Sequence, residues 1–208
     1  MLPDFPDFMF FLISAMTLNI VPGADVLYVA SQSLIAKKNG ILAALGICTG
    51  MTMYMLATTF GLAEVLRYSP VTFNLIKIAG ALYLAYLAWQ AFSHSNEDIN
   101  LKLGHKKKAS LFQSYYKGIL TTSLNPKVGL FFLTFLPQFT DAQRGNMPLQ
   151  LLTLGICFVI LGLITDVSYV YIFQYLKKNL FSKPAIQHWF HKITGIIFAL
   201  LALKILFS

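Results

Sequence analysis

Long apolar segments alternate with short polar stretches along the chain. The apolar segments cover residues 8–36, 41–63, 71–92, 111–137, 149–176 and 185–207. Each approaches or exceeds the roughly 20 residues that a helix needs to cross the hydrocarbon core of a bilayer. The pattern predicts an all-α integral membrane protein with six transmembrane helices. These spans fill nearly the whole chain, so we expect a single transmembrane domain over residues 1–208.

Two of the six apolar segments are interrupted by helix breakers next to polar residues. The first contains Pro22, Gly23 and Asp25, and the fourth contains Asn125, Pro126 and Lys127. Pro22 and Pro126 are 104 positions apart, which is half of the 208 residues. We therefore predict that the first and fourth helices are broken at matching places.

The matched breaks indicate an internal duplication. Residues 77–80 (KIAG) also resemble residues 192–195 (KITG), at an offset of 115 positions. We assign repeat one to about 1–95, a basic linker to about 96–108 and repeat two to about 109–208. Each repeat contains an odd number of spans, so the two must have opposite orientations in the membrane. This predicts two inverted three-helix repeats, an architecture that many secondary transporters share.

Composition and charge agree with this interpretation. Hydrophobic residues make up 57% of the chain and charged residues only 12%, whereas about 25% is usual for a soluble domain. The formal net charge is +8, and lysines cluster in the loops after the first, third and fifth spans: Lys37, Lys38, Lys102, Lys106, Lys107, Lys108, Lys177, Lys178 and Lys183. The positive-inside rule places these loops in the cytoplasm and both termini outside. Membrane topology thus explains the charge better than nucleic-acid binding does.

The breaks supply the candidate transport site. A half-helix that starts at a break presents free N–H groups, and one that ends there presents free carbonyls. Asn125 suits the N-cap position and Pro126 the first position of the following half-helix. Crossed breaks would offer both signs of charge, which fits a small zwitterionic substrate. We predict that the substrate-binding residues face one shared cavity: Pro22, Gly23, Asp25, Asn125, Pro126 and Lys127.

Three charged residues are expected deep inside the spans: Asp25, Lys127 and Asp166. Ionisable groups within a membrane usually mark substrate or proton pathways. Because the chain has no phosphate-binding loop signature for ATP, the energy should come from an ion gradient. We expect Asp166, in an unbroken span, to carry the proton, and Asp25 to organise the site or bind an amino group. The alternative is a structural ion pair between Lys127 and either acid.

Other features predict packing rather than chemistry. No cluster of cysteine, histidine and carboxylate residues suggests a metal site, so we expect no metal and no cofactor. Gly46, Gly50, Gly155 and Gly162 would let helices approach closely. Packing within the bundle is favoured for these glycines, and a homo-oligomer stays open.

The sequence resembles the LysE/RhtB family of amino-acid exporters over essentially its whole length. Residues 22–25 (PGAD) are similar to the family's Pro-Gly-Pro signature, with Ala24 in place of the second proline. Residues 125–139 (NPKVGLFFLTFLPQF) resemble its fourth span, residues 77–92 (KIAGALYLAYLAWQAF) its third, and Asp166 an acid in its fifth. The resemblance implies export of amino acids or close derivatives across the inner (plasma) membrane, driven by the proton motive force.

Two other classes of protein are alternatives. An integral membrane enzyme acting on a lipid-linked substrate would need grouped acids, histidines or a nucleophile with a base. The sequence favours this less, because its histidines lie at loops or span edges and its acids are sparse. A non-transporting accessory membrane protein would leave the two broken helices and their buried charges without a purpose.

Overall fold

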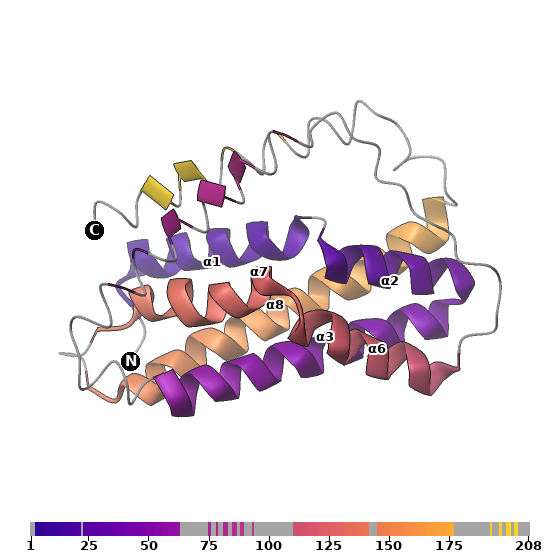
Figure 1. Cartoon of the computed structure of the whole chain (residues 1–208), viewed down its shortest axis with the longest axis horizontal. Coiled ribbons are helices and arrows are strands. Elements are labelled where there is room, and N and C mark those ends of the chain that lie inside the picture. Colours follow the sequence, from indigo (N-terminus) through magenta and orange to yellow (C-terminus); the bar gives the residue numbers. More distant parts are fainter. Residues whose placement is uncertain are drawn as a thin grey trace.

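The computed structural model describes residues 3–21, 23–62, 110–141 and 145–176, with isolated positions between 75 and 93 and between 192 and 203. Apart from those positions, the predicted third and sixth spans, including most of the repeated KIAG and KITG motifs, lie outside the described residues. The basic linker and Pro22 also lie outside them. The described part is all-helical (Figure 1).

Two bent helix pairs and two continuous helices form the described bundle. Helix α1 (Phe5–Ile20) meets α2 (Ala24–Ile35) at 50°, and α6 (Leu111–Ser123) meets the segment Pro126–Phe139 at 53°. That segment comprises α7 (Pro126–Leu130), the π-helix η2 (Phe131–Phe135) and the 3₁₀-helix η3 (Leu136–Phe139). Helix α3 (Lys37–Ala57) continues into the π-helix η1 (Thr58–Leu62), and α8 (Met147–Leu176) is unbroken.

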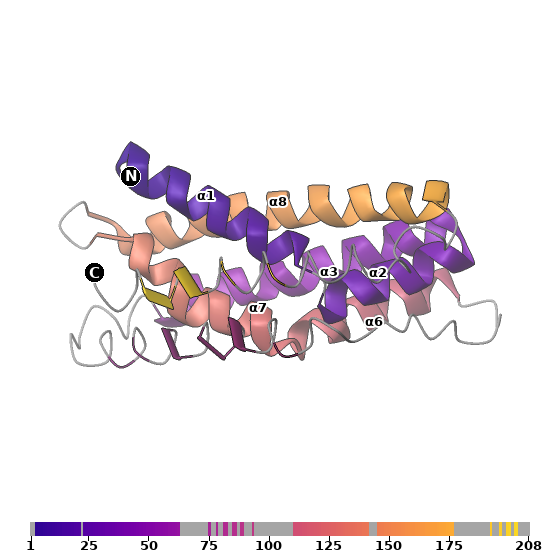
Figure 2. The same ribbon diagram turned by 90° about the horizontal axis from the view of Figure 1, so that it is seen from above.

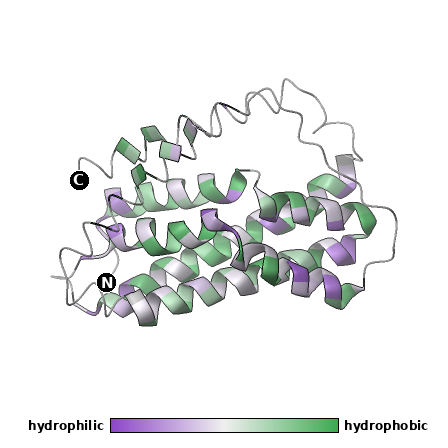
Figure 3. Ribbon diagram, in the orientation of Figure 1, coloured by the Kyte–Doolittle hydropathy of each residue, from purple (hydrophilic) through white to green (hydrophobic). Residues whose placement is uncertain are grey.

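These elements correspond to four of the predicted spans. Among the described residues, α3 with η1 and α8 are long and apolar enough to cross a membrane, and counting each bent pair as one span gives four. In Figures 1 and 2 the helices run along the long axis of the molecule, with both bends near its middle. Figure 3 shows apolar residues along the helices and hydrophilic ones where α6 joins α7. The predicted breaks in the first and fourth spans are therefore confirmed.

The connection between α2 and α3 is shorter than the sequence predicted. A polar loop was expected around Lys37 and Lys38, but both residues begin α3, and Ala36 alone links the helices. Gly40 allows this tight connection, because a β-carbon there would collide with the hydroxyl of Ser33. The amide of Gln174 in α8 donates to the carbonyl of Ser33 and ties the connection to the bundle.

Glycines bring α3 close to its neighbours. A β-carbon at Gly118 of α6 would lie 2.6 Å from the carbonyl oxygen of Ala43, and one at Gly46 of α3 would collide with the carbonyl of Tyr115. Gly155 and Gly162 of α8 face Met55 and Met51 of α3 in the same way. The expectation that these glycines serve packing within the bundle is confirmed.

An aromatic cluster fills the half of the bundle that contains α1. The rings of Phe131 and Phe158 stack with centroids 4.2 Å apart, and Phe132 meets Phe158 edge to face at 5.2 Å. Phe11 of α1 meets Phe139 of η3 edge to face at 5.4 Å. The cluster joins α1, η2, η3 and α8, and its Phe158 reaches the breaks described next.

Candidate functional site

Asn125 starts the second half of the fourth span, as the sequence predicted. Its side-chain oxygen accepts a hydrogen bond from the main-chain N–H of Lys127 at 3.0 Å, which is the N-cap geometry. Pro126 occupies the first helical position, where its missing N–H has no consequence. The start of α7 is thus fixed by three consecutive residues.

Asp25 links the two breaks. It lies in the first turn of α2, with its side chain only 4% exposed. Its carboxylate accepts a hydrogen bond from the hydroxyl of Thr122 at 3.0 Å and one from the amide of Asn125 at 2.8 Å. Asn125 therefore caps α7 with its oxygen while its nitrogen holds Asp25 across the site. Thr122 was not predicted from the sequence, because no pattern distinguishes it from the other threonines in the apolar segments.

Lys127 makes the reverse connection, from α7 to the end of α1. Its ammonium group donates to the carbonyl oxygens of Leu18 at 3.0 Å and Val21 at 3.2 Å. A β-carbon at Gly23 would lie 3.1 Å from the Lys127 Nζ atom, so the glycine leaves room for the ammonium group. The sequence predicts free carbonyls at the end of this half-helix, and in the structure the ammonium group of Lys127 binds two of them.

The structural ion pair is not formed as a direct contact among the described residues. Lys127 donates to main-chain carbonyls, and Asp25 accepts from Thr122 and Asn125. Opposite charges instead face a common space. Asp25, Lys127 and Asp166 line one cavity of about 10 Å³ together with Asn19 and the apolar side chains of Leu18, Val26, Met51, Val128 and Phe158. The three charged residues expected inside the spans thus come together.

The cavity is closed in this conformation. Its volume is close to the minimum that holds one water molecule, whereas ligand pockets usually measure roughly 300 to 1,000 Å³. Asp166 projects from the unbroken helix α8 and is 3% exposed. Its Oδ2 atom has no hydrogen-bond partner among the described residues. The cavity in this conformation therefore has room for about one water molecule and for no amino acid.

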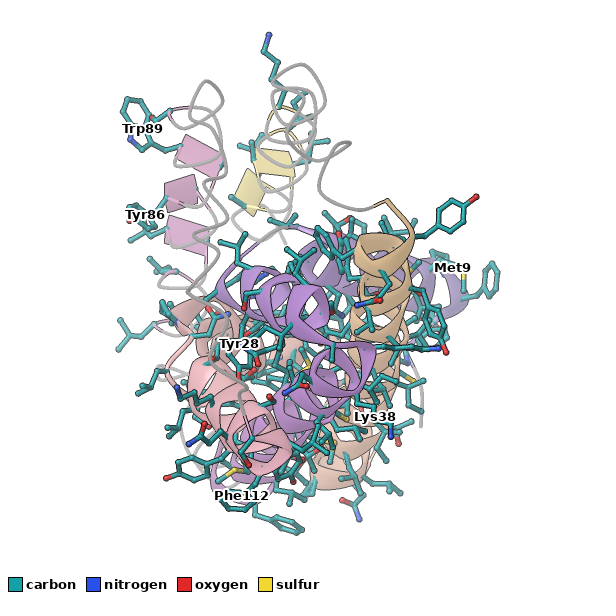
Figure 4. All side chains as sticks on the ribbon, turned by 90° about the vertical axis from the view of Figure 1, so that its right-hand side faces the viewer. Met9, Tyr28, Lys38, Tyr86, Trp89 and Phe112 are labelled. Atoms are coloured by element: carbon teal, nitrogen blue, oxygen red, sulfur yellow. The ribbon has the colours of Figure 1, made fainter. Side chains whose placement is uncertain are left out.

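A second, larger space adjoins the break on the side of α2 and α6. This groove of about 500 Å³ is lined by Ala24, Tyr28, Lys117, Asn125 and Pro126, among others. Figure 4 looks along the bundle from this end, with Tyr28 labelled. The Tyr28 hydroxyl donates to the carbonyl of Ser114 at 2.9 Å and so links α2 to α6. Asn125 connects the two spaces, since it lines the groove and bonds to Asp25, which lines the cavity.

The predicted site residues are thus placed as follows. Asp25 and Lys127 share the cavity, Gly23 packs against Lys127, and Asn125 bonds to Asp25. Pro126 faces the groove.

Two tyrosines donate hydrogen bonds to helix-end carbonyls at the breaks, and neither was predicted from the sequence. The Tyr169 hydroxyl of α8 donates to the carbonyl of Ile20, the last residue of α1, at 2.6 Å. The Tyr54 hydroxyl of α3 donates to the carbonyl of Ser123, the last residue of α6, at 2.7 Å. The tyrosines are 115 positions apart (169 − 54), the same offset as the repeated KIAG and KITG motifs. That shared offset is the signal that could have found them.

A bundle of apolar helices with two broken spans, and with buried charges where the breaks meet, is typical of membrane transport proteins. The comparisons agree. The model of the LysE type translocator family matches residues 16–208, so the chain belongs to this family. It is a translocator and not an enzyme.

Relatives match along most of their length. The chain is 35% identical over 188 residues to the uncharacterized membrane protein YrhP of Bacillus subtilis (strain 168), covering 86% of this chain and 88% of that protein. It is 26% identical over 198 residues to the leucine efflux protein of Enterobacter sp. (strain 638), covering 92% and 91%. It is 29% identical over 186 residues to the leucine efflux protein of Salmonella typhimurium, covering 86% and 80%. No solved structure matches the chain.

Proposed function

We propose that this protein is a secondary transporter that exports an amino acid or a close derivative from the cytoplasm across the inner (plasma) membrane. The observation that carries the proposal is the meeting of Asp25, Lys127 and Asp166 at two broken spans in a translocator of this family. A site with both signs of charge suits a zwitterion. Relatives named leucine efflux protein make a neutral, aliphatic amino acid the first substrate to test.

The substrate site consists of Pro22, Gly23, Asp25, Asn125, Pro126 and Lys127. In the closed conformation the charged groups of this site are hydrogen-bonded within the protein, because Asp25 accepts from Asn125 and Lys127 donates to a carbonyl of α1. A substrate carboxylate would compete for Lys127, and a substrate amino group would compete for the carboxylates. Export then requires these internal bonds to be exchanged for bonds to the substrate.

The architecture is that of two inverted repeats. Tyr54, from the second span, caps the break of the fourth, and Tyr169, from the fifth span, caps the break of the first. A two-fold relation between the repeats exchanges these two contacts with each other. The equal offset of the tyrosines and of the repeated motifs supports the same relation.

Asp166 carries the coupling proton. It lies on an unbroken helix, lines the cavity that Asp25 and Lys127 also line, and has one oxygen without a partner among the described residues. Asp25 organises the site, because Thr122 and Asn125 each bond to one of its two oxygens. The proton motive force then drives export as Asp166 is exposed to either side in turn.

Purified protein in proteoliposomes tests the proposal directly. Counterflow of labelled leucine and related amino acids should be detected, and an imposed proton gradient should drive accumulation. In Asp166→Asn we expect substrate exchange to persist while proton-driven accumulation is lost. Unchanged accumulation in this variant would refute the role of Asp166, and absence of counterflow with every amino acid would refute the transport proposal.

The orientation can be tested in cells. Single cysteines replacing Lys106 in the predicted basic linker and Arg144 between the fourth and fifth predicted spans should react differently with an impermeant reagent. The lysine bias predicts labelling from outside at position 144 and protection at position 106. Strong labelling at 106 with none at 144 would reverse the orientation.

A further inference from the structure

The end of α1 has an unusual set of partners. The last carbonyls of a helix have no partner within the helix and need one from elsewhere. Here Tyr169 bonds to the carbonyl of Ile20, and the ammonium group of Lys127 bonds to the carbonyls of Leu18 and Val21. A single cation thus lies between two main-chain oxygens at the bend, 3.0 and 3.2 Å away.

The surroundings of the ammonium group are built for a cation. Lys127 belongs to α7, on the other broken span, so its ammonium group lies at the first break through a contact between distant parts of the chain. The absence of a side chain at Gly23 lets the Nζ and Cε atoms approach to 3.1 and 3.5 Å of the position that a β-carbon would occupy. Asp25 and Asp166 line the adjoining cavity with Lys127 and provide negative charge nearby.

We propose that the carbonyls of Leu18 and Val21 form a site for a monovalent cation, which the chain fills with its own lysine. In transporters with discontinuous helices, carbonyls of the unwound backbone commonly coordinate a free cation. Here the cation is tethered, so the break stays closed without sodium or another free ion. The inference goes beyond the proposed function, because it holds whatever the substrate is.

The consequence is that removal of the Lys127 side chain creates an empty cation site. In Lys127→Ala the carbonyls, Gly23 and the two carboxylates remain, and the space of the amine is vacated. Ammonium or methylammonium, which share the hydrogen-bonding chemistry of the lost group, should bind there. In Lys127→Met an uncharged side chain of similar length fills the space, so the same ions should not bind.

Thermal unfolding of the purified proteins in detergent tests this without any substrate. Each protein is compared in ammonium chloride, methylammonium chloride and choline chloride at equal ionic strength, since choline is too bulky for the site. We expect Lys127→Ala to unfold at a lower temperature than the unaltered protein in choline. Ammonium at about ten times its Kd should raise its Tm by about 3 to 5 °C, with saturation.

The control variants define the opposing outcomes. Ammonium should not raise the Tm of three control proteins: the unaltered protein, Lys127→Met and Lys117→Ala. Lys117 serves as the control lysine because it is exposed on α6, away from the two carbonyls. If ammonium raised the Tm of any control protein as much as that of Lys127→Ala, the proposal would be overturned. The same holds if the Tm of Lys127→Ala is equal in all three salts. Failure of Lys127→Ala to fold even in ammonium counts against it as well. Failure of leucine counterflow would concern the proposed function alone.

Discussion

Exchanging the residues at positions 25 and 125 tests how the two breaks are joined. Asp25 accepts the amide hydrogen of Asn125 at 2.8 Å, and Asn125 caps α7 with its oxygen. Asn125→Asp keeps a good N-cap but sets two carboxylates against each other. Asp25→Asn removes the charge, yet its amide can still contact both Thr122 and Asn125. The double variant places the amide at 25 and the carboxylate at 125, so every hydrogen bond can form again.

The distances give the expected magnitudes. Two full charges at 2.8 Å repel by about 6 kcal/mol at an effective dielectric constant of about 20. A lost hydrogen bond to a charged group adds about 1.5 to 3 kcal/mol. Because two carboxylates can relieve repulsion by moving apart or sharing a proton, we expect Asn125→Asp to lower the free energy of unfolding by about 3 kcal/mol or more. Asp25→Asn should cost about 1 to 2 kcal/mol, since its bonds become neutral.

The free energy of unfolding can be measured by titrating the purified proteins with sodium dodecyl sulfate and following circular dichroism. If the two side chains meet as described, the double variant should regain about 2 kcal/mol or more relative to Asn125→Asp alone. A double variant as unstable as the sum of the single changes would show that the residues do not contact each other. An Asn125→Asp protein as stable as the unaltered one would refute the reasoning at its first step.

Two further predictions concern stability. Tyr54→Phe and Tyr169→Phe should each lower the free energy of unfolding by about 1 kcal/mol, because each leaves one helix-end carbonyl without its donor. A loss of stability in only one of the two variants would contradict the equivalent roles of the tyrosines. Gly118→Ala should cost about 1 to 3 kcal/mol, because its β-carbon would press on the carbonyl of Ala43 at 2.6 Å. Gly61→Ala is the matched control, with no atom within 4 Å, and equal thermal unfolding of the two variants would contradict the tight packing of α3 on α6.

The sequence was sufficient to predict the local features of the site. Proline, glycine and asparagine act on the backbone at their own positions, so the bends and the N-cap at Asn125 could be read directly. The long apolar pattern of residues 149–176 likewise predicted the unbroken helix that carries Asp166. The prediction of a polar loop around Lys37 was wrong. Gly40 packs against Ser33 and allows a one-residue connection between α2 and α3, which the polarity of the segment does not indicate.

The partners across the breaks could not be predicted, because they depend on contacts between distant residues. Lys127 reaches carbonyls more than 100 positions earlier in the chain, and main-chain oxygens carry no residue identity that a pattern could detect. Tyr54 and Tyr169 are two of 10 tyrosines in a chain that also has 18 phenylalanines. Only the hydroxyl group and the equal offset distinguish them from packing residues.

Among the described residues, Asp25 and Lys127 make four hydrogen bonds between the two broken spans: Asp25 accepts two and Lys127 donates two. Separating the spans breaks all four, so neither break can open while the other keeps its present contacts. At roughly 0.6 to 1.5 kcal/mol net for each bond, breaking these four bonds costs about 2 to 6 kcal/mol. A ligand shifts such an equilibrium only by binding the open state more tightly. The proposed zwitterionic substrate would do so, because its carboxylate and ammonium groups would replace the partners that Lys127 and Asp25 give up.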